Sequence, residues 1–318
     1  MVEILVSIGI IVLLMALLIP YVSRAVKQST RMRAQGDFQA ISTALEAYRQ
    51  EFGDIPRIPL DSTGTPMKNT GAAILAKALL GPFGDGYNGA VPDASDPAQY
   101  SGSSSYKAGD CVWAASPNAT YVALRDMPPN TDPTNAATFP FWTKFDPHDG
   151  ADGPGFRVRQ GGKIYPPYLD PAKVKTQGCA IIDPYGHPIL YFPARPGRIN
   201  PALAGSSPGA YVDQSPLSMF NANDNFDACR RDGEGSSDDP IVLARIQIMF
   251  GDFHSNGYVE SSEGESAFNE PYILWSAGTD GLFGPAGYSP PTSSVSAEKV
   301  AENKKMVAEC DDVMNVQK

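Results

Sequence analysis

The stretch Ile4–Val22, ILVSIGIIVLLMALLIPYV, contains nineteen residues without a charge. As an α-helix it would be roughly 28 Å long, close to the hydrocarbon thickness of a bilayer. A cleaved signal peptide would need a basic segment before the run and a small-x-small site after it, and neither is present. A plain membrane anchor fits the length. It leaves the edge carboxylate of Glu3 unexplained, because an unpaired carboxylate is costly in lipid.

The sequence after this run predicts that the same helix continues. Pro20 removes one helical hydrogen bond, so we expect a kink there. Beyond the basic residues Arg24, Lys27, Arg31 and Arg33, apolar residues recur at alternating spacings of three and four: Ala34, Phe38, Ile41, Leu45, Tyr48 and Phe52. This stripe is typical of a helix that packs on a globular domain. Gly53 and Ile55-Pro56 predict its end. We therefore expect one helical region over residues 1–56, with an apolar part at 1–23 and an amphipathic part at 24–56.

Met1-Val2-Glu3-Ile4-Leu5-Val6, with Pro20 seventeen residues after Glu3, resembles the start of type IV pilins and type II secretion pseudopilins. The resemblance implies that a prepilin peptidase removes a short basic leader and that the new N-terminus is methylated. It also implies that the helix first holds the subunit in the inner membrane and then packs in a filament core, where Glu3 pairs with a neighbour's N-terminal amine. The family's leader and first two mature residues do not precede Met1. Two explanations remain open: numbering from inside the mature protein, or a differently assigned start.

The remainder, residues 57–318, predicts a β-rich head with long loops. The expected helix is 74–80, and the expected strands are 121–124, 180–182, 189–192, 241–250 and 272–275. Residues 183–188 are predicted to turn between two of these strands. Loop insertions are expected at about 60–178 and 195–240, and a solvated helical tail at about 293–318.

Two further segments extend the resemblance. Asp183-Pro184-Tyr185-Gly186-His187-Pro188 is similar to the Asp-Pro-aromatic-Gly-x-Pro turn of major pseudopilins, and Leu274-Trp275-Ser276-Ala277-Gly278-Thr279-Asp280-Gly281 resembles their Ser-x-Gly-x-Asp-Gly loop. The implied fold is α+β and pilin-like: a long N-terminal α-helix packed on an antiparallel β-sheet with long loop insertions.

Composition excludes other classes of protein. The 318 residues carry a formal net charge of −10, which disfavours nucleic acid as a partner because phosphate binding needs a basic face. Segments matching G-x-G-x-x-G (84–89) and G-x-S-x-G (205–209) lack the strand and helix that these motifs require. With only three histidines, all in turn-like contexts, we expect no enzyme.

The four cysteines are Cys111, Cys179, Cys229 and Cys310, none of them in a Cys-x-x-Cys pair. Their even number and wide spacing predict two disulfides in an oxidising compartment, and free buried thiols are the alternative. Three connectivities are possible. Pairing in chain order joins Cys111 to Cys179 and Cys229 to Cys310.

Two loops are candidate calcium sites. The segment 252–263 follows the calcium-loop template, with ligands expected from Asp252, Asn256, the Tyr258 carbonyl, Glu260 and Glu263; His254 weakens the match. A turn with exposed acids is the alternative. The resemblance to major pseudopilins implies a second site with ligands from Leu274, Ser276 and Asp280, although the family's further acid downstream is not evident. Both loops would serve one ion if adjacent strands brought them together.

These observations predict a non-enzymatic, homopolymeric subunit of an extracellular type IV pilus-like filament. Its partners would be the inner membrane before assembly, the prepilin peptidase and the pilus or secretion machinery. Two alternatives stay open: a periplasmic pseudopilin of a type II secretion system, and a membrane-tethered calcium-binding module.

Overall fold

The structure of the chain is a computed structural model. The described residues are 2–58, 71–80, 99–107, 110–114, 119–123, 126–135, 142–144, 156–157, 164–177, 180–195, 209–214, 218–231, 233–260, 270–290 and 295–316. Within helices and strands, some side chains lie outside this description, among them those of Glu3, Pro20, Cys111 and Glu260.

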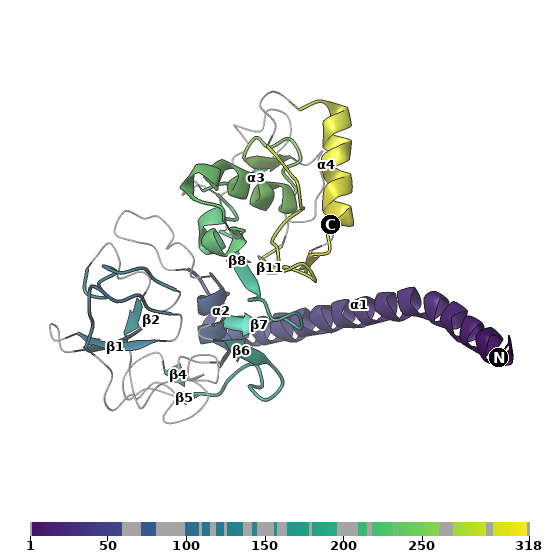
Figure 1. Cartoon of the computed structure of the whole chain (residues 1–318). Coiled ribbons are helices and arrows are strands. Elements are labelled where there is room, and N and C mark those ends of the chain that lie inside the picture. Colours follow the sequence, from purple (N-terminus) through teal and green to yellow (C-terminus); the bar gives the residue numbers. More distant parts are fainter. Residues whose placement is uncertain are drawn as a thin grey trace.

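Helix α1 (Val2–Phe52) is continuous over 51 residues and projects far beyond the rest of the molecule (Figure 1). The backbone stays helical through Pro20. The helix ends where predicted: Gly53 has φ +82° and its N–H donates to the Arg49 carbonyl at 2.7 Å. The predicted apolar stripe is confirmed, since Ala34, Phe38, Ile41 and Leu45 are buried.

Helix α2 (Gly71–Leu80) packs between α1 and strands β7 (Ala180–Ile182) and β8 (Leu190–Pro193). This confirms the predicted helix at 74–80. Gly71 permits the close approach to β8, because a Cβ there would lie 2.2 Å from the Tyr191 carbonyl oxygen. Asn225, from the 3-10 helix η2 (Ala222–Asn225), accepts from the Ala72 N–H at 3.1 Å and donates to the Tyr191 carbonyl at 2.8 Å. One remote side chain therefore holds the start of α2 against β8.

The central sheet has the order β12–β11–β8, with both pairs antiparallel. Strand β11 (Tyr272–Ser276) is buried along its whole length, which confirms the predicted strand at 272–275. One face packs on α1 and α2 through Tyr191 and Leu274. The other face packs on α3 and α4 through Phe192 and Trp275. This layered arrangement is visible in Figure 1.

The C-terminal tail forms the predicted helix, with most of its residues exposed, but it is part of the fold and not an appendage to it. Helix α4 (Ala297–Glu309) buries Asn303 and Val307, and strand β12 (Val313–Met314) pairs with β11. The buried Asp312 carboxylate accepts from the Trp275 indole N–H at 2.8 Å and the Gly284 N–H at 2.7 Å. The tail was misread because its charged residues cover only the outer face of α4.

The predicted strand at 241–250 is also wrong, because this segment is helix α3 (Asp239–Met249). Pro240 lies in its first turn, where a missing N–H costs nothing. Residues 244–249 are all buried, so the helix has no polar face to reveal a 3.6-residue period. A helical segment that is buried on all sides, such as residues 244–249, resembles a buried strand in composition.

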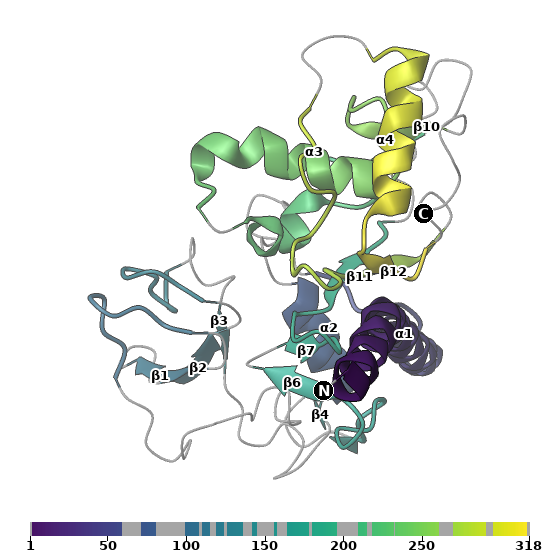
Figure 2. The ribbon, with the colours of Figure 1, turned by 45° about the vertical axis from the view of Figure 1, so that its right-hand side comes forward.

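The remaining strands form small antiparallel sheets (Figure 2). These are β1–β2–β3 (Cys111–Ala114, Ala119–Ala123, Trp142–Lys144), β4–β5 (Phe156–Arg157, Ile164–Tyr165), β6–β7 (Lys175–Gln177, Ala180–Ile182) and β9–β10 (Gly209–Tyr211, Tyr258–Glu260).

The strand predicted at 121–124 overlaps β2, and those at 180–182 and 189–192 correspond to β7 and β8. The turn at 183–188 joins β7 and β8, but these strands belong to different sheets and are linked by a single bridge, Ile182 to Pro188. The molecule is thus a mixed helix-and-sheet protein with antiparallel sheets.

Candidate functional site

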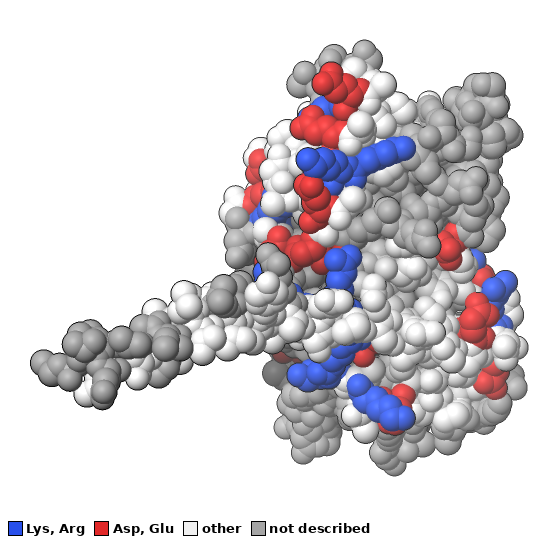
Figure 3. Space-filling model, turned by 90° about the vertical axis from the view of Figure 1, so that its right-hand side faces the viewer, with Lys and Arg blue, Asp and Glu red and all other residues white. Residues whose placement is uncertain are grey.

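The N-terminal part of α1 carries a long run of exposed apolar side chains, which we call the assembly segment (residues 4–32). Figure 3 shows this part of the helix standing clear of the head. Exposed fractions lie between 52% and 68% for twelve large side chains: Ile4, Ile8, Val12, Leu13, Leu14, Met15, Leu18, Ile19, Tyr21, Val22, Val26 and Met32. Soluble monomers rarely expose a contiguous apolar surface of this kind, so it marks an interaction site.

The predicted assembly residues Glu3 and Pro20 lie on this helix, but their side chains are outside the described part. Their roles therefore stay predictions. Among the described residues, no helix combines the length and the hydropathy needed to cross a membrane.

The first candidate calcium loop follows α3 and leads into β10. The carboxylate of Asp252 is fully buried and accepts from the backbone N–H groups of Asn256 at 3.0 Å and Gly257 at 2.7 Å. Gly257, at φ +91°, makes the sharp turn that the template needs at its sixth position. Tyr258 and Glu260 lie in β10; the side chain of Glu260 and the whole of Glu263 fall outside the described residues. Gly257 thus has the positive φ expected at the sixth position of the template, and calcium at this loop stays a prediction.

The second candidate loop is held by hydrogen bonds within the chain. The Leu274 carbonyl, an expected ligand, accepts from the Asn315 N–H at 3.2 Å, and the Ser276 hydroxyl donates to Asp183 at 2.5 Å. The Asp280 carboxylate accepts from the Leu282 N–H at 2.9 Å and is exposed. The expected ligand groups thus have partners in the protein, and calcium at this loop stays a prediction.

An acid that the sequence did not indicate supports the same loop. Asp311 lies just after α4, and its carboxylate accepts from the N–H groups of Thr279 at 2.6 Å and Asp280 at 3.1 Å. Burial would raise the pKa of Asp311, but the hydrogen bonds from Thr279 outweigh it and the pKa is lowered. One potential ligand atom from each of Cys310, Asp311 and Asp312 lies within 4.8 Å of the others. The only signal in the sequence was two adjacent acids after a charged helix.

The two candidate loops do not come together through adjacent strands as predicted. Strand β10, at the end of the first loop, pairs with β9, whereas β11, which leads into the second, pairs with β8 and β12. The expectation of one shared ion rested on adjacency in sequence order, and the actual pairing separates them into two sheets.

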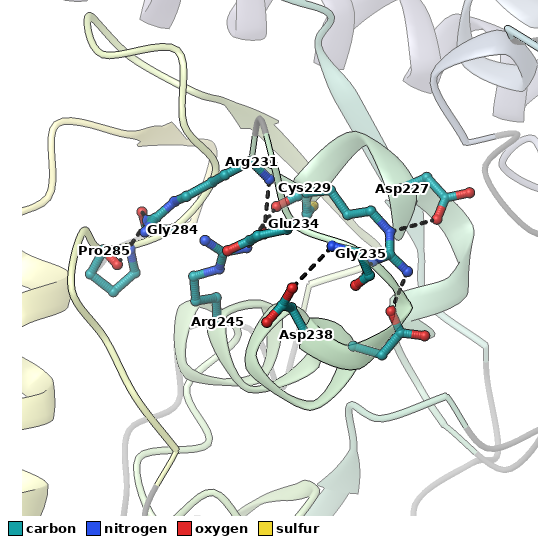
Figure 4. A network of polar contacts seen from close by, with 11 residues as sticks. Asp227, Cys229, Arg231, Glu234, Gly235, Asp238, Arg245, Gly284 and Pro285 are labelled. Carbon is teal, nitrogen blue, oxygen red and sulfur yellow. Dashed lines mark hydrogen bonds and ion pairs between the residues drawn. The ribbon is translucent and has the colours of Figure 1, made fainter.

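A network of charged side chains anchors the segment before α3 to the loop after β11 (Figure 4). Arg245 is fully buried and donates to Glu234 at 2.5 Å and to the Cys229 carbonyl at 3.1 Å. Arg231 donates to the carbonyls of Gly284 at 3.2 Å and Pro285 at 3.0 Å. Burial alone would raise the pKa of Glu234, but hydrogen bonds from the Arg231 backbone and from Arg245 lower it. The network stabilises the head.

Two of the four cysteines can be assessed, and the predicted pairing of Cys229 with Cys310 is wrong. Neither residue is disulfide-bonded. Cys229 is fully buried in the core around α3, and burial raises the pKa of its thiol, whereas Cys310 lies at the end of α4 beside Asp311. The side chain of Cys111 and the whole of Cys179 lie outside the described residues.

In comparisons with known proteins, the chain matches no family model, no curated protein and no solved structure.

Proposed function

We propose that this protein is a structural subunit of an extracellular type IV pilus-like filament and that it polymerises through the assembly segment of α1. The observation that carries the proposal is the exposure of twelve large apolar side chains on one projecting helix. Complete burial of a leucine-sized side chain is worth about 1.5–3 kcal/mol. Covering even part of this surface offsets the roughly 4–15 kcal/mol cost of association.

The division of the chain into two parts supports the proposal. The buried stripe of α1 begins at Ala34, and the described core of the head includes no residue before it. The head therefore has its own core, and no described side chain of the assembly segment belongs to it. Before assembly, a bilayer is the apolar environment that would shelter this segment.

The periplasmic pseudopilin and the tethered calcium-binding module use the same helix differently. A pseudopilin would form short fibres that stay inside the envelope, and a tethered module would form none. Electron microscopy of material sheared from the cell surface separates them, with an antibody against the head as label. We expect abundant long labelled fibres. Short fibres confined to the envelope would favour the pseudopilin, and their complete absence would favour the tethered module.

A further inference from the structure

Two arginines of the network in Figure 4 depend on a single carboxylate. Arg245, from α3, is completely buried and donates from Nη2 to Glu234 at 2.5 Å. Arg231 reaches the same Glu234 oxygen only through its backbone N–H, at 2.9 Å. Among the described residues, no carboxylate forms an ion pair with the Arg231 guanidinium. One positive charge of the pair is therefore left without a direct counter-ion.

Three nitrogen atoms of these two side chains are buried and have no hydrogen-bond partner among the described residues. They are Nε of Arg231 and both Nε and Nη1 of Arg245. A buried donor without a partner is costly, and more so on a charged group, because it has given up hydrogen bonds to water. The two guanidinium groups thus offer donors and positive charge in the interior of the head.

Gly284, in the loop after β11, lies against both arginines. Its carbonyl accepts from Nη2 of Arg231 at 3.2 Å. A Cβ on Gly284 would lie 3.2 Å from the Cβ of Arg245. The two side chains therefore flank one residue of this loop, which places their unpartnered donors in the same part of the head.

Two further acids near Arg231 do not balance its charge. Asp312 already accepts from two N–H groups of the core, and Asp280 is exposed, so water screens it. Burial lowers the pKa of Arg231, and the positive charge of Arg245 lowers it further, against the opposing effect of the acids. The surroundings of Arg231 thus disfavour a positive charge that has no closer counter-ion.

The neighbouring Arg230 shows how an arginine of this segment is fully paired. Its Nε donates to Asp227 at 3.2 Å and its Nη1 to the Gly235 carbonyl at 2.6 Å. Its Nη2 donates to Asp239. Every nitrogen of the Arg230 side chain has a partner, and two carboxylates face one guanidinium.

We propose that Arg231 and Arg245 together bind one small inorganic anion, of the size and charge of chloride, in the interior of the head. The anion accepts from the unpartnered nitrogens and neutralises the charge that Glu234 alone does not balance. A water molecule would accept hydrogen bonds but would leave that charge. Complete burial of Arg245 excludes a large ligand. Bound there, the anion joins the segment before α3 to the loop after β11.

Urea unfolding of the purified full chain in a non-ionic detergent tests the site. Sodium chloride is exchanged stepwise for sodium gluconate at constant pH and ionic strength, with EGTA in every sample, so that screening and calcium stay the same. Gluconate is too large for a site in which Arg245 is closed to solvent. We expect chloride to stabilise the chain: above the dissociation constant, each tenfold increase in chloride should lower the unfolding constant about tenfold. Equal stability in the two salts would overturn the proposal.

Substitution of each arginine locates the anion. R245M and R231M each remove one of the two guanidinium groups and should abolish the chloride dependence. R231M decides the question if R245M does not fold, because Arg231 is only partly buried. The matched control is R230M, which removes the fully paired neighbour and should lower stability but keep the chloride dependence.

Two results with these variants would contradict the site. Chloride dependence that survives in R231M or in a folded R245M would place the anion elsewhere. Loss of the dependence in R230M as well would show a general response to removal of an arginine. The site belongs to the head and is measured without filaments, so its failure leaves the proposed function standing.

Discussion

The Ser276 hydroxyl donates a hydrogen bond of 2.5 Å to the buried Asp183 carboxylate across 93 positions of sequence. The other oxygen of Asp183 accepts from the N–H groups of Tyr185 and His187, both at 2.9 Å. This one carboxylate therefore joins the turn at 183–188 to the loop at 274–281. The first segment is the turn between β7 and β8 and the second is the second candidate calcium loop, and the fold brings them into direct contact.

Replacing Ser276 by alanine should destabilise the head by about 1–3 kcal/mol, because it removes the donor from a buried acceptor. Chemical unfolding of the purified protein measures the loss. S103A is the matched control, since the Ser103 hydroxyl bonds to that of Ser101 at the surface and its removal should change stability by less than about 0.5 kcal/mol. Equal stability of S276A and the wild type would show that the link between the two segments is unimportant.

The buried pair of Arg245 and Glu234 should respond differently to loss of each partner. E234A leaves the Arg245 charge fully buried, so we expect a loss of about 3–5 kcal/mol. R245M removes the buried charge itself and leaves a Glu234 side chain that is 19% exposed, so its cost should be smaller. Replacing Glu302 by alanine removes one partner of the exposed pair with Lys299 and should lower the free energy of unfolding by at most about 1 kcal/mol. Denaturant unfolding of the three variants gives the order, and a larger loss in R245M than in E234A would contradict it.

Asp224 should make the head less stable as pH rises. Burial raises the pKa of Asp224 to about 7, although Arg195 donates to it at 2.7 Å. The folded-state pKa lies above the ordinary value of 3.8, so folding favours the protonated carboxyl. The stability that Asp224 contributes to the folded state is therefore complete below about pH 4 and is lost as pH rises through 7. D224N, which still accepts from Arg195, should lack this contribution. Urea unfolding at pH 5, 6, 7 and 8 tests this, and parallel pH profiles for D224N and the wild type would refute it.

Calcium should raise the thermal stability of the head if either candidate loop binds it. An ion present at a hundred times its dissociation constant stabilises by about 2.7 kcal/mol. We expect an increase in Tm with calcium and its reversal by EGTA. D252N should abolish the calcium-dependent increase if the first loop is the site, and D280N if the second is. A Tm that is the same in calcium and in EGTA would exclude a stabilising ion at both loops.

The sequence predicted features that depend on local pattern. The stripe from Ala34 to Leu45 and the stop at Gly53 defined α1 correctly, because period and terminating residues are local signals. Helix α3 was missed because residues 244–249 are buried on every side, which removes the 3.6-residue period from its second half. The links from Asp183 to Ser276 and from Asp312 to Trp275 join distant positions, and no local pattern encodes them.

The candidate site shows the same contrast between features encoded in a local pattern and features that depend on contacts between distant positions. The apolar run was evident from residue types, and the exposure of its side chains is the structural property that supports assembly. Asp311 was missed because its role depends on the pairing of β12 with β11, which places the chain end beside Thr279.

The central claim is that the assembly segment holds filaments together, and substitution of Leu14 tests it most directly. Leu14 is 52% exposed and lies outside the described core of the head, so L14E should leave the head folded, as circular dichroism and Tm can verify. A301E, on the exposed side of α4, introduces the same charge on the head. Electron microscopy of sheared surface material should show long fibres for the wild type and A301E and none for L14E. Fibres of equal number and length in L14E would contradict the account.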